Sequence, residues 1–248
     1  MTWEEINRKR LPFIRMGDRL FRLMYSEIRS ELKASLKNLT TPEEITQAAR
    51  NVQIKEDQIR GYYERFYIRT GVAFAKYQQK GTQKPIEYKN EDVWAAKIKE
   101  TVRTKTAKKI TKVIQTAYED IQNITKIAVE TGIEEGWGMD KIARAIVKQQ
   151  GEIDLWKALR IARTEVVAAS SEGIKIGAEE IPGDKVKVWI STFDERSRPE
   201  HMAMDGVRVP LNESFNVDGD MLEYPGDSNG KPENITNCRC GYEIVRIN

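Results

Sequence analysis

The chain has 248 residues, of which 40% are hydrophobic and 32% are charged, proportions typical of a soluble, helix-rich protein and not of a disordered one. No run of about 18 apolar residues occurs, which excludes a membrane span. The first residues lack the basic start and apolar stretch of a secretory signal, so we expect the protein to be made and kept in the cytoplasm of its host.

The net charge of +3 conceals an uneven distribution along the chain. Residues 1–150 hold 29 Lys and Arg against 20 Asp and Glu, whereas residues 151–248 hold 12 against 18. A basic first part joined to an acidic second part indicates two surfaces with different partners. At any one position, a solvated helix face is the simpler interpretation.

The first 80 residues are predicted to be helical. Apolar residues recur at helical spacing over residues 3–39, and Pro12 is expected to divide them into a short first piece and a longer helix. Thr41 and Glu44 around Pro42 predict a helix start with a capping box. The aromatic-rich segment 45–79 then predicts one long helix or two, and we interpret its aromatic stripe as helix packing.

A linker and a third helical region follow. Residues 80–85 combine glycine and proline and are predicted to form a linker. Apolar residues at a period near 3.6 predict a helix over about 91–131. The basic stretch 103–109 within it is interpreted as a solvated face, although it could also touch a phosphate backbone.

The next helices are expected to be separated by glycines. The glycine-rich stretch 132–138 predicts the end of the preceding helix, and a short helix is expected over 141–150. Gly151 is expected to break this run, and Asp154 to cap a further helix over about 155–178.

The periodicity then changes to the two-residue repeat of strands. The segments expected to form one small sheet are Val186–Ile190, Val207–Val209, Met221–Tyr224 and Tyr242–Ile247. The predicted fold is therefore α+β: long, extended N-terminal α-helices followed by a small C-terminal α+β domain with a short antiparallel sheet.

The single histidine and both cysteines of the chain, His201, Cys238 and Cys240, lie in this last part. A disulfide between Cys238 and Cys240 would close a small, strained ring and is not expected in a reducing cytoplasm. The three side chains are candidate zinc ligands, with Asp194 or Asp205 as a fourth. Their spacing differs from a standard zinc knuckle, so packed free thiols beside a hydrogen-bonded histidine are the alternative.

A catalytic interpretation uses some of the same residues. A Cys/His nucleophile is disfavoured because Cys238 precedes an apolar strand and no signature of a thiol hydrolase surrounds it. Arg196, Arg198 and His201 could instead clamp a phosphodiester, as in a small metal-free nuclease.

A structural role explains more of the polar residues, because guanidinium groups pair bidentately with carboxylates and could pin irregular loops to the sheet. Arg163 and Glu165 lie on different helix faces, and at least one is expected to reach these loops. The predicted structural polar cluster comprises Arg163, Glu165, Asp194, Arg196, Arg198, His201, Asp205, Asp227 and Arg239.

Several motifs occur in a familiar order. They are Ile161-Ala162-Arg163-Thr164-Glu165, Trp189, Asp194-x-Arg196-x-Arg198-x-x-His201, Asp205-Gly206, Pro225-Gly226-Asp227 and Asn237-Cys238-Arg239-Cys240, preceded by the glycine turn at 136–143. Residues from about 130 to 248 thereby resemble the phage head morphogenesis family, also called Mu F-like minor capsid proteins of tailed bacteriophages. Met204 stands where many relatives have leucine, a difference in packing.

The resemblance implies a non-enzymatic virion component, found in the interior of the phage head near the portal after assembly in the host cytoplasm. It implies a family domain at 131–248 and a basic helical region at 1–130 that faces the portal, the capsid or DNA. The implied partners are the portal protein, the major capsid or scaffolding protein and packaged double-stranded DNA, with an influence on DNA packaging or ejection. Some relatives carry a toxin domain after the Cys-x-Cys strand, for which the eight residues after Cys240 leave no room.

Overall fold

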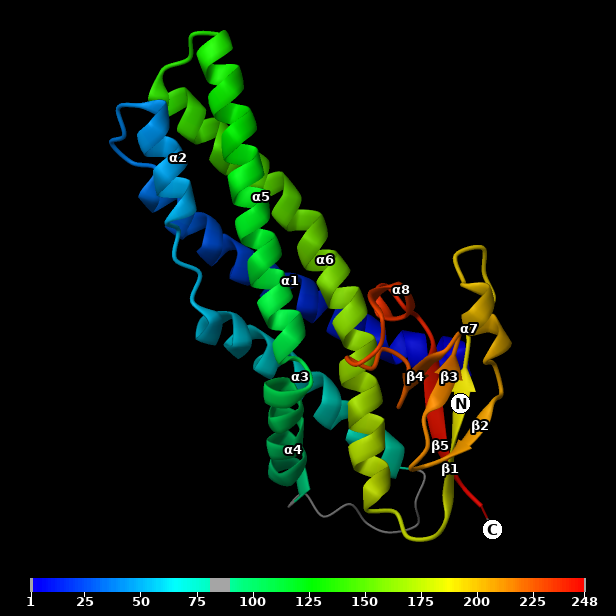
Figure 1. Ribbon diagram of the computed structural model, residues 1–248. Helices are drawn as coiled ribbons and strands as arrows, with labels where there is room; N and C mark the ends of the chain where they lie inside the picture. The colour runs from blue at the N-terminus through cyan, green and yellow to red at the C-terminus, as the bar shows by residue number, and fades with distance from the viewer. Residues whose placement is uncertain (1, 81–89, 248) are drawn as a thin grey trace. The chain divides into compact units, whose positions relative to one another are not determined.

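The computed structural model describes residues 2–80 and 90–247, which form helices and five short strands (Figure 1). The helices are α1 (Trp3–Ser35), α2 (Pro42–Arg50), α3 (Glu56–Gln79), α4 (Asn90–Thr104), α5 (Ala107–Glu134), α6 (Met139–Glu179), α7 (Pro199–Ala203) and α8 (Pro232–Ile235). The strands are β1 (Lys185–Ile190), β2 (Arg208–Pro210), β3 (Phe215–Val217), β4 (Asp220–Leu222) and β5 (Gly241–Arg246). The predicted α+β class, with long helices before a small antiparallel sheet, is confirmed.

The chain folds into two compact units, each built from separate stretches of sequence. The first unit contains Met1–Gly17, Tyr63–Thr106 and Arg160–Asn248, and the second contains Asp18–Tyr62 and Ala107–Leu159. Helices α1, α3 and α6 each contribute to both units. The predicted cluster residues all belong to the first unit.

Two helices are continuous where the sequence analysis expected a break. The expected division at Pro12 was wrong, because α1 runs continuously from Trp3 to Ser35. Proline removes one backbone hydrogen bond and crowds the preceding turn. On either side of it, Ile6 is fully buried and the Phe13 ring packs 6.0 Å from that of Phe74, and this burial holds the helix together.

The expected break at Gly151 was also wrong, because α6 continues through it to Glu179. Asp154 does not cap a new helix but lies buried within α6, where its carboxylate is 2.6 Å from Arg29 Nη1 and accepts a 2.8 Å hydrogen bond from Gln150. A glycine inside a helix costs about 1 kcal/mol relative to alanine. The tertiary contacts of Asp154 offset a cost of that size.

The single helix expected over 91–131 is two helices, because α4 ends at Thr104 and α5 begins at Ala107. At the break, Lys105 places its ammonium group 3.0 Å from the carboxylate of Glu223. The capping box is confirmed, since Thr41 Oγ1 accepts from Glu44 N and the Glu44 side chain accepts from Thr41 N. The predicted linker at 80–85 lies, apart from Lys80, outside the described residues.

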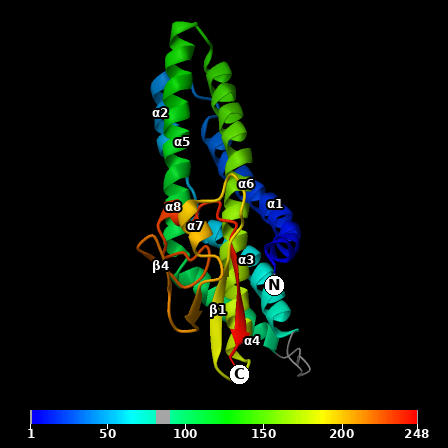
Figure 2. The ribbon, with the colours of Figure 1, turned by 90° about the vertical axis from the view of Figure 1, so that its right-hand side faces the viewer.

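The strands form two sheets rather than the expected single one. Three strands pair antiparallel in the order β2-β1-β5, with Val186 opposite Val245 and Trp189 opposite Tyr242. The β4 strand pairs instead with β3, which the sequence analysis did not predict. Figure 2 shows β1 and β5 lying side by side. The fully buried Trp189 and Tyr242 explain why this central pairing has a fixed register.

Helices α3 and α6 approach closely within the first unit. A Cβ atom added at Gly173 would lie 2.2 Å from the carbonyl oxygen of Gly71, and one added at Gly177 would lie 2.6 Å from that of Ala75. Only glycine permits such an approach of two backbones. The buried Phe74, Ile174 and Tyr242 complete an apolar core between these helices and β5.

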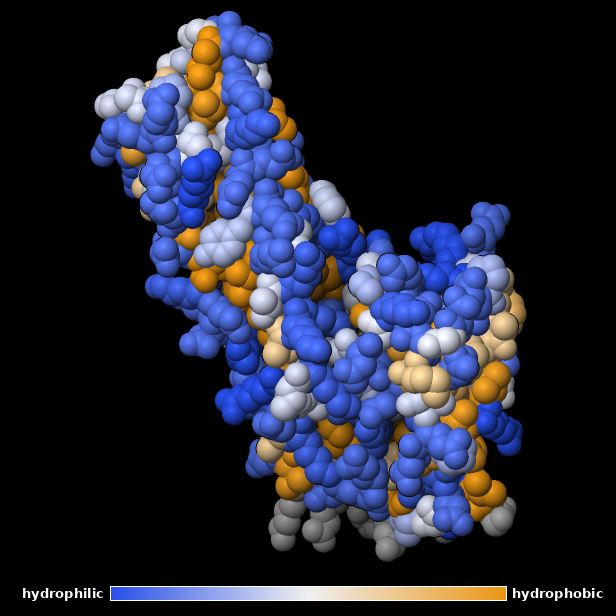
Figure 3. All heavy atoms as spheres, viewed as in Figure 1, coloured by the Kyte–Doolittle hydropathy of each residue, from blue (hydrophilic) through white to orange (hydrophobic). Residues whose placement is uncertain are grey.

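Hydrophilic side chains cover most of the face shown in Figure 3. Among the helices of the described residues, none combines the length and the apolar character needed to cross a membrane. Large apolar side chains are exposed at separate places, Phe193 at 67% and Trp156 at 51%.

Candidate functional site

The chain brings its histidine and two cysteines together at one end of the central strands. After β1, a loop leads to α7, which carries His201, and after α8 the chain turns at Asn237 into the cysteines and β5. Asn237 has a φ of 52°, a left-handed conformation that asparagine tolerates, and its N–H donates a 3.1 Å hydrogen bond to Thr164 Oγ1 on α6. This tight turn directs Cys238 and Cys240 inward.

The three side chains form a buried thiol–imidazole cluster, defined as His201, Cys238 and Cys240. His201 Nδ1 lies 3.7 Å from Cys238 Sγ and 3.4 Å from Cys240 Sγ. Each of the three residues is 2% exposed, and both cysteines are free thiols. Within the described residues, His201 Nε2 is buried without a hydrogen-bond partner. The cluster therefore turns one imidazole nitrogen towards both sulfurs.

The two thiols differ in their acidity. The hydrogen bond between them, joined by one from His201, lowers the pKa of Cys240 below its ordinary value, although burial opposes this effect. The same hydrogen bond and burial raise the pKa of Cys238. A thiolate at Cys240 is the form of cysteine that binds metal ions.

The cluster has the dimensions of a tetrahedral metal site. With a Zn–S bond of about 2.3 Å and a Zn–N bond of about 2.0–2.1 Å, a sulfur and a nitrogen on one ion lie about 3.6 Å apart. The two observed sulfur–nitrogen distances, 3.4 and 3.7 Å, bracket this value, and all three ligand atoms lie within 4.8 Å of one another. His201, Cys238 and Cys240 could therefore hold a zinc ion without large movement.

The two aspartates considered as a fourth ligand lie elsewhere. Asp194 accepts a bidentate pair of hydrogen bonds from the Arg239 guanidinium group, which holds the pKa of that carboxyl well below its usual range. Asp205 Oδ1 accepts a 2.7 Å hydrogen bond from Ser191 N. A fourth ligand could come from the Ser191 hydroxyl, 3.6 Å from Cys240 Sγ, or from outside the chain.

Other members of the structural polar cluster also fasten loops. Arg198 Nη2 donates a 2.8 Å hydrogen bond to the carbonyl oxygen of Thr236, joining the α7 and α8 ends of this region. Asp227 accepts hydrogen bonds of 2.9 and 3.0 Å from the backbone N–H groups of Glu223 and Asn229. These contacts join loops to loops, and charged hydrogen bonds of this kind stabilise irregular backbone.

The side chains of Arg163 and Glu165 point in different directions, because the two residues lie on different faces of α6. Glu165 is buried and accepts a 2.5 Å hydrogen bond from the hydroxyl of Tyr67 on α3, away from the loops of the cluster. Arg163 is exposed and lines a cavity together with Arg196 and Arg198. Of the two, it is Arg163 that lies near the loop residues.

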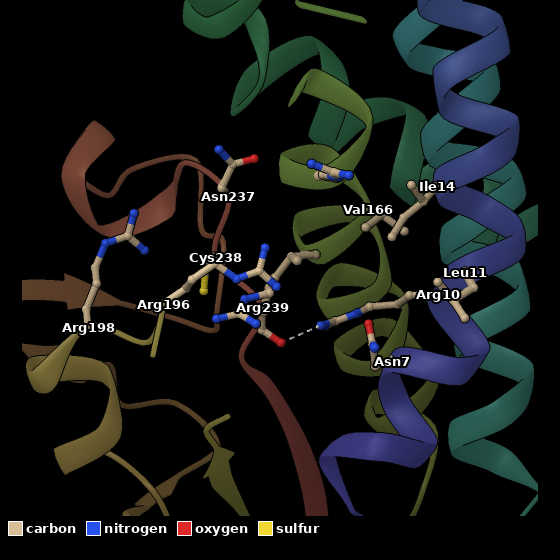
Figure 4. A pocket seen from close by; sticks show the side chains of 12 residues that line it. Asn7, Arg10, Leu11, Ile14, Val166, Arg196, Arg198, Asn237, Cys238 and Arg239 are labelled. Carbon is tan, nitrogen blue, oxygen red and sulfur yellow. Dashed lines mark hydrogen bonds between the residues drawn. The ribbon is translucent and has the colours of Figure 1, made fainter. Parts of the chain in front are cut away.

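This arginine-lined cavity has a volume of about 450 Å³ (Figure 4). Its walls come from the start of α1, the middle of α6, the loop before α7 and the turn before β5. Five arginines line it: Arg10, Arg163, Arg196, Arg198 and Arg239. Cys238 also lines it, whereas His201 is not among its lining residues.

Arg10 is the residue of this site that sequence reasoning missed. It is 2% exposed, and it donates 2.8 Å hydrogen bonds from Nε to Ser170 Oγ and from Nη1 to the carbonyl oxygen of Cys240. Burial lowers its pKa to about 10, so it keeps its charge at neutral pH. The available signal was its place four residues after the buried Ile6, on the apolar stripe of a helix.

Comparison with known proteins identifies the class of this site-bearing region. Residues 122–243 match the family described as "Phage Mu protein F like protein". The matched part of the chain includes the C-terminal part of α5, all of α6 and the thiol–imidazole cluster. The predicted resemblance is confirmed.

Individual relatives add more specific similarities. The chain is 28% identical over 138 residues to Minor head protein GP7 of Bacillus phage SPP1, covering 54% of this chain and 44% of that protein. It is 34% identical over 122 residues to NAD(+)–arginine ADP-ribosyltransferase EFV of Enterococcus faecalis, covering 48% of this chain and 24% of that protein. It is 24% identical over 151 residues to the uncharacterised YqbB of Bacillus subtilis, covering 59% of this chain and 44% of that protein. The chain thus spans less than half the length of these relatives, and no solved structure matches it significantly.

Proposed function

We propose that this chain is a minor head protein of a tailed phage, which associates with the portal inside the procapsid and affects DNA packaging or ejection. The observation that carries the proposal is the family match over residues 122–243, together with the similarity to a phage minor head protein over 54% of this chain. The partners we propose are the portal protein, the major capsid or scaffolding protein, and packaged double-stranded DNA.

We assign the parts of the chain to these partners by charge. Residues 131–248 form the family domain in this proposal, and residues 1–130 face the portal, the capsid or DNA. The excess of Lys and Arg before residue 150 supports this assignment, because basic surfaces attract the phosphate backbone.

The role we propose is structural and not enzymatic. The rival, a phosphodiester-cleaving enzyme, requires His201, Arg196 and Arg198 to meet one substrate. His201 is 2% exposed, its Nδ1 faces two sulfurs, and it does not line the cavity that Arg196 and Arg198 share. A general base must come within hydrogen-bond reach of the proton that it removes. The similarity to the ADP-ribosyltransferase spans only 24% of that protein.

We further propose that the thiol–imidazole cluster binds a zinc ion and thereby stabilises this end of the fold. The two cysteines precede β5, and His201 lies on α7, so an ion bound to all three would fasten separate segments. A structural metal site contributes its binding free energy to folding.

Co-expression tests the head-protein proposal. The chain would be produced with its cognate portal, scaffolding and major capsid proteins, and assembled particles would be purified by gradient centrifugation. We expect the chain to sediment with procapsids and to be lost from them when the portal is omitted. Purified particles without the chain, under conditions in which portal is incorporated, would overturn the proposal.

A parallel assay tests the rival. The purified protein would be incubated with DNA and RNA, beside His201→Ala and the exposed control Arg208→Ala. We expect no cleavage by any of the three. Cleavage by the unmodified protein and by Arg208→Ala, but not by His201→Ala, would establish the enzyme instead.

A further inference from the structure

The arginine-lined cavity carries positive charge that the carboxylates of the described residues do not neutralise. Twelve residues line it, five of them arginines and none of them a carboxylate. Asp194 pairs with Arg239. Within the described residues, neither Arg163 nor Arg196 has a carboxylate partner. In the part of the chain that the structure describes, these two guanidinium groups at the cavity therefore have no counter-charge.

Arg10 adds an unsatisfied donor at the same place. Its Nη2 group is buried and has no hydrogen-bond partner among the described residues, while Nε and Nη1 are both bonded. A buried, charged donor without an acceptor is unfavourable unless a ligand supplies one. Figure 4 shows the Arg10 side chain reaching from α1 towards the turn that carries Arg239. An anion in the cavity would accept this remaining donor.

The remaining walls restrict the kind of anion. Besides the polar groups, the side chains of Leu11, Ile14, Val166 and Val167 line the cavity. A volume of about 450 Å³ exceeds what a single small anion fills and lies within the range of sites for small organic ligands. Guanidinium groups bind phosphate through paired N–H donors, and the aliphatic wall can pack against an organic group attached to it.

We propose that this cavity binds a phosphate group carried by a nucleotide unit, with the phosphate held by Arg10, Arg163 and Arg196. The nucleotide unit is either a free nucleotide or the phosphorylated end of a nucleic acid strand, which present the same chemistry. The site does not depend on the proposed head function, because the cavity is complete within one chain.

Isothermal titration of the full chain at about 0.15 M salt, where unspecific phosphate contacts are weakened, tests the site. The probes are inorganic phosphate, a deoxynucleoside monophosphate, and a short single-stranded oligonucleotide with and without its 5′ phosphate. We expect saturable binding of the monophosphate at one site, tighter than that of inorganic phosphate. Preference for the 5′-phosphorylated oligonucleotide over the monophosphate would identify a strand end as the source, and the reverse a free nucleotide.

Variants separate a built site from general attraction. The double variant Arg163→Gln and Arg196→Gln removes exposed charges and is expected to lose affinity for the monophosphate by about tenfold or more. Arg208→Gln with Arg246→Gln removes two exposed charges elsewhere on the same unit and should leave affinity unchanged. Absence of saturable binding by the unmodified chain, or equal losses in the two double variants, would overturn the proposal.

Discussion

Arg10 on the first helix donates a 2.8 Å hydrogen bond from Nη1 to the carbonyl oxygen of Cys240, 230 residues further along the chain. The same guanidinium group is bonded to Ser170 on α6, so one buried side chain joins three segments of the first unit. Trp3 adds a second connection, from Nε1 to the carbonyl oxygen of Arg239 at 3.1 Å. The start of the chain is thereby an integral part of the fold that carries the cysteines.

The first prediction concerns this connection. Arg10→Ala should lower the free energy of unfolding by about 2–4 kcal/mol, because it leaves a buried carbonyl and a buried hydroxyl without their donors. The exposed Arg8 lies on the same helix, and Arg8→Ala should change stability by no more than about 0.5 kcal/mol. Chemical denaturation followed by circular dichroism measures both. Equal stability of the two variants would show that the Arg10 contacts contribute nothing.

The second prediction concerns metal at the thiol–imidazole cluster. Protein purified from zinc-containing medium should hold about one equivalent of zinc, and chelation should lower its Tm. Cys240→Ser should abolish zinc binding, because it removes the thiolate ligand, and its Tm should no longer respond to chelator. Asp205→Asn serves as the control and should retain the metal, since Asp205 is engaged by Ser191 N. Metal-free protein whose Tm ignores both zinc and chelator would refute a zinc site.

The third prediction concerns the contact between α3 and α6. Gly173→Ala should destabilise the protein by about 3 kcal/mol or more, because the new methyl group would meet the Gly71 backbone at 2.2 Å and the helices must separate. Gly151→Ala on the same helix is the matched control. There the added Cβ approaches only the flexible Arg29 side chain, at 3.4 Å, so the change should stabilise the helix by about 0.5–1 kcal/mol. If both substitutions changed the stability in the same direction, the close approach of α3 and α6 would be contradicted.

The fourth prediction concerns acid stability. Burial acts to raise the pKa of Glu223, but hydrogen bonds from Lys175 and Lys105 outweigh it and lower the pKa to about 2, from an ordinary 4.5. A carboxyl with a lowered folded-state pKa stabilises the native state above the unfolded pKa, and this contribution is lost as the pH falls from about 4.5 towards 2. Because the side chain is 37% exposed, solvent screening limits the effect to about 1 kcal/mol.

The measurement compares the unmodified protein with Glu223→Gln by urea denaturation at fixed ionic strength between pH 5 and pH 2.5, a range that lies mostly between the two pKa values. The unmodified protein should lose more stability across this range than the variant. Parallel curves would show that the lysine pair does not favour the ionised carboxylate.

Local signals in the sequence predicted local structure well. The capping box at Thr41 was predictable because all of its atoms lie within four residues. The β1 and β5 strands were predictable from alternating apolar residues, and the glycine turn after α5 from Gly136, whose φ is 66°. The α+β class followed from these elements in order.

Features decided by tertiary contacts were not predictable in this way. Pro12 and Gly151 interrupt a helix by propensity, yet buried neighbours and the Arg29–Asp154 ion pair keep both helices whole. The β3 strand has three residues, too few for a periodic signal. Arg10 could be located on an apolar helix face, but its partners lie 160 and 230 residues away, and a single sequence holds no information about that proximity.

Quantitative peptide mass spectrometry of gradient-purified procapsids tests the proposed function most directly. Particles would be assembled from the cognate portal, scaffolding and capsid proteins together with this chain, once with and once without the portal gene. A head protein that associates with the portal should be present in the first particles and absent or strongly reduced in the second. Particles that contain portal but none of this chain would contradict the assignment.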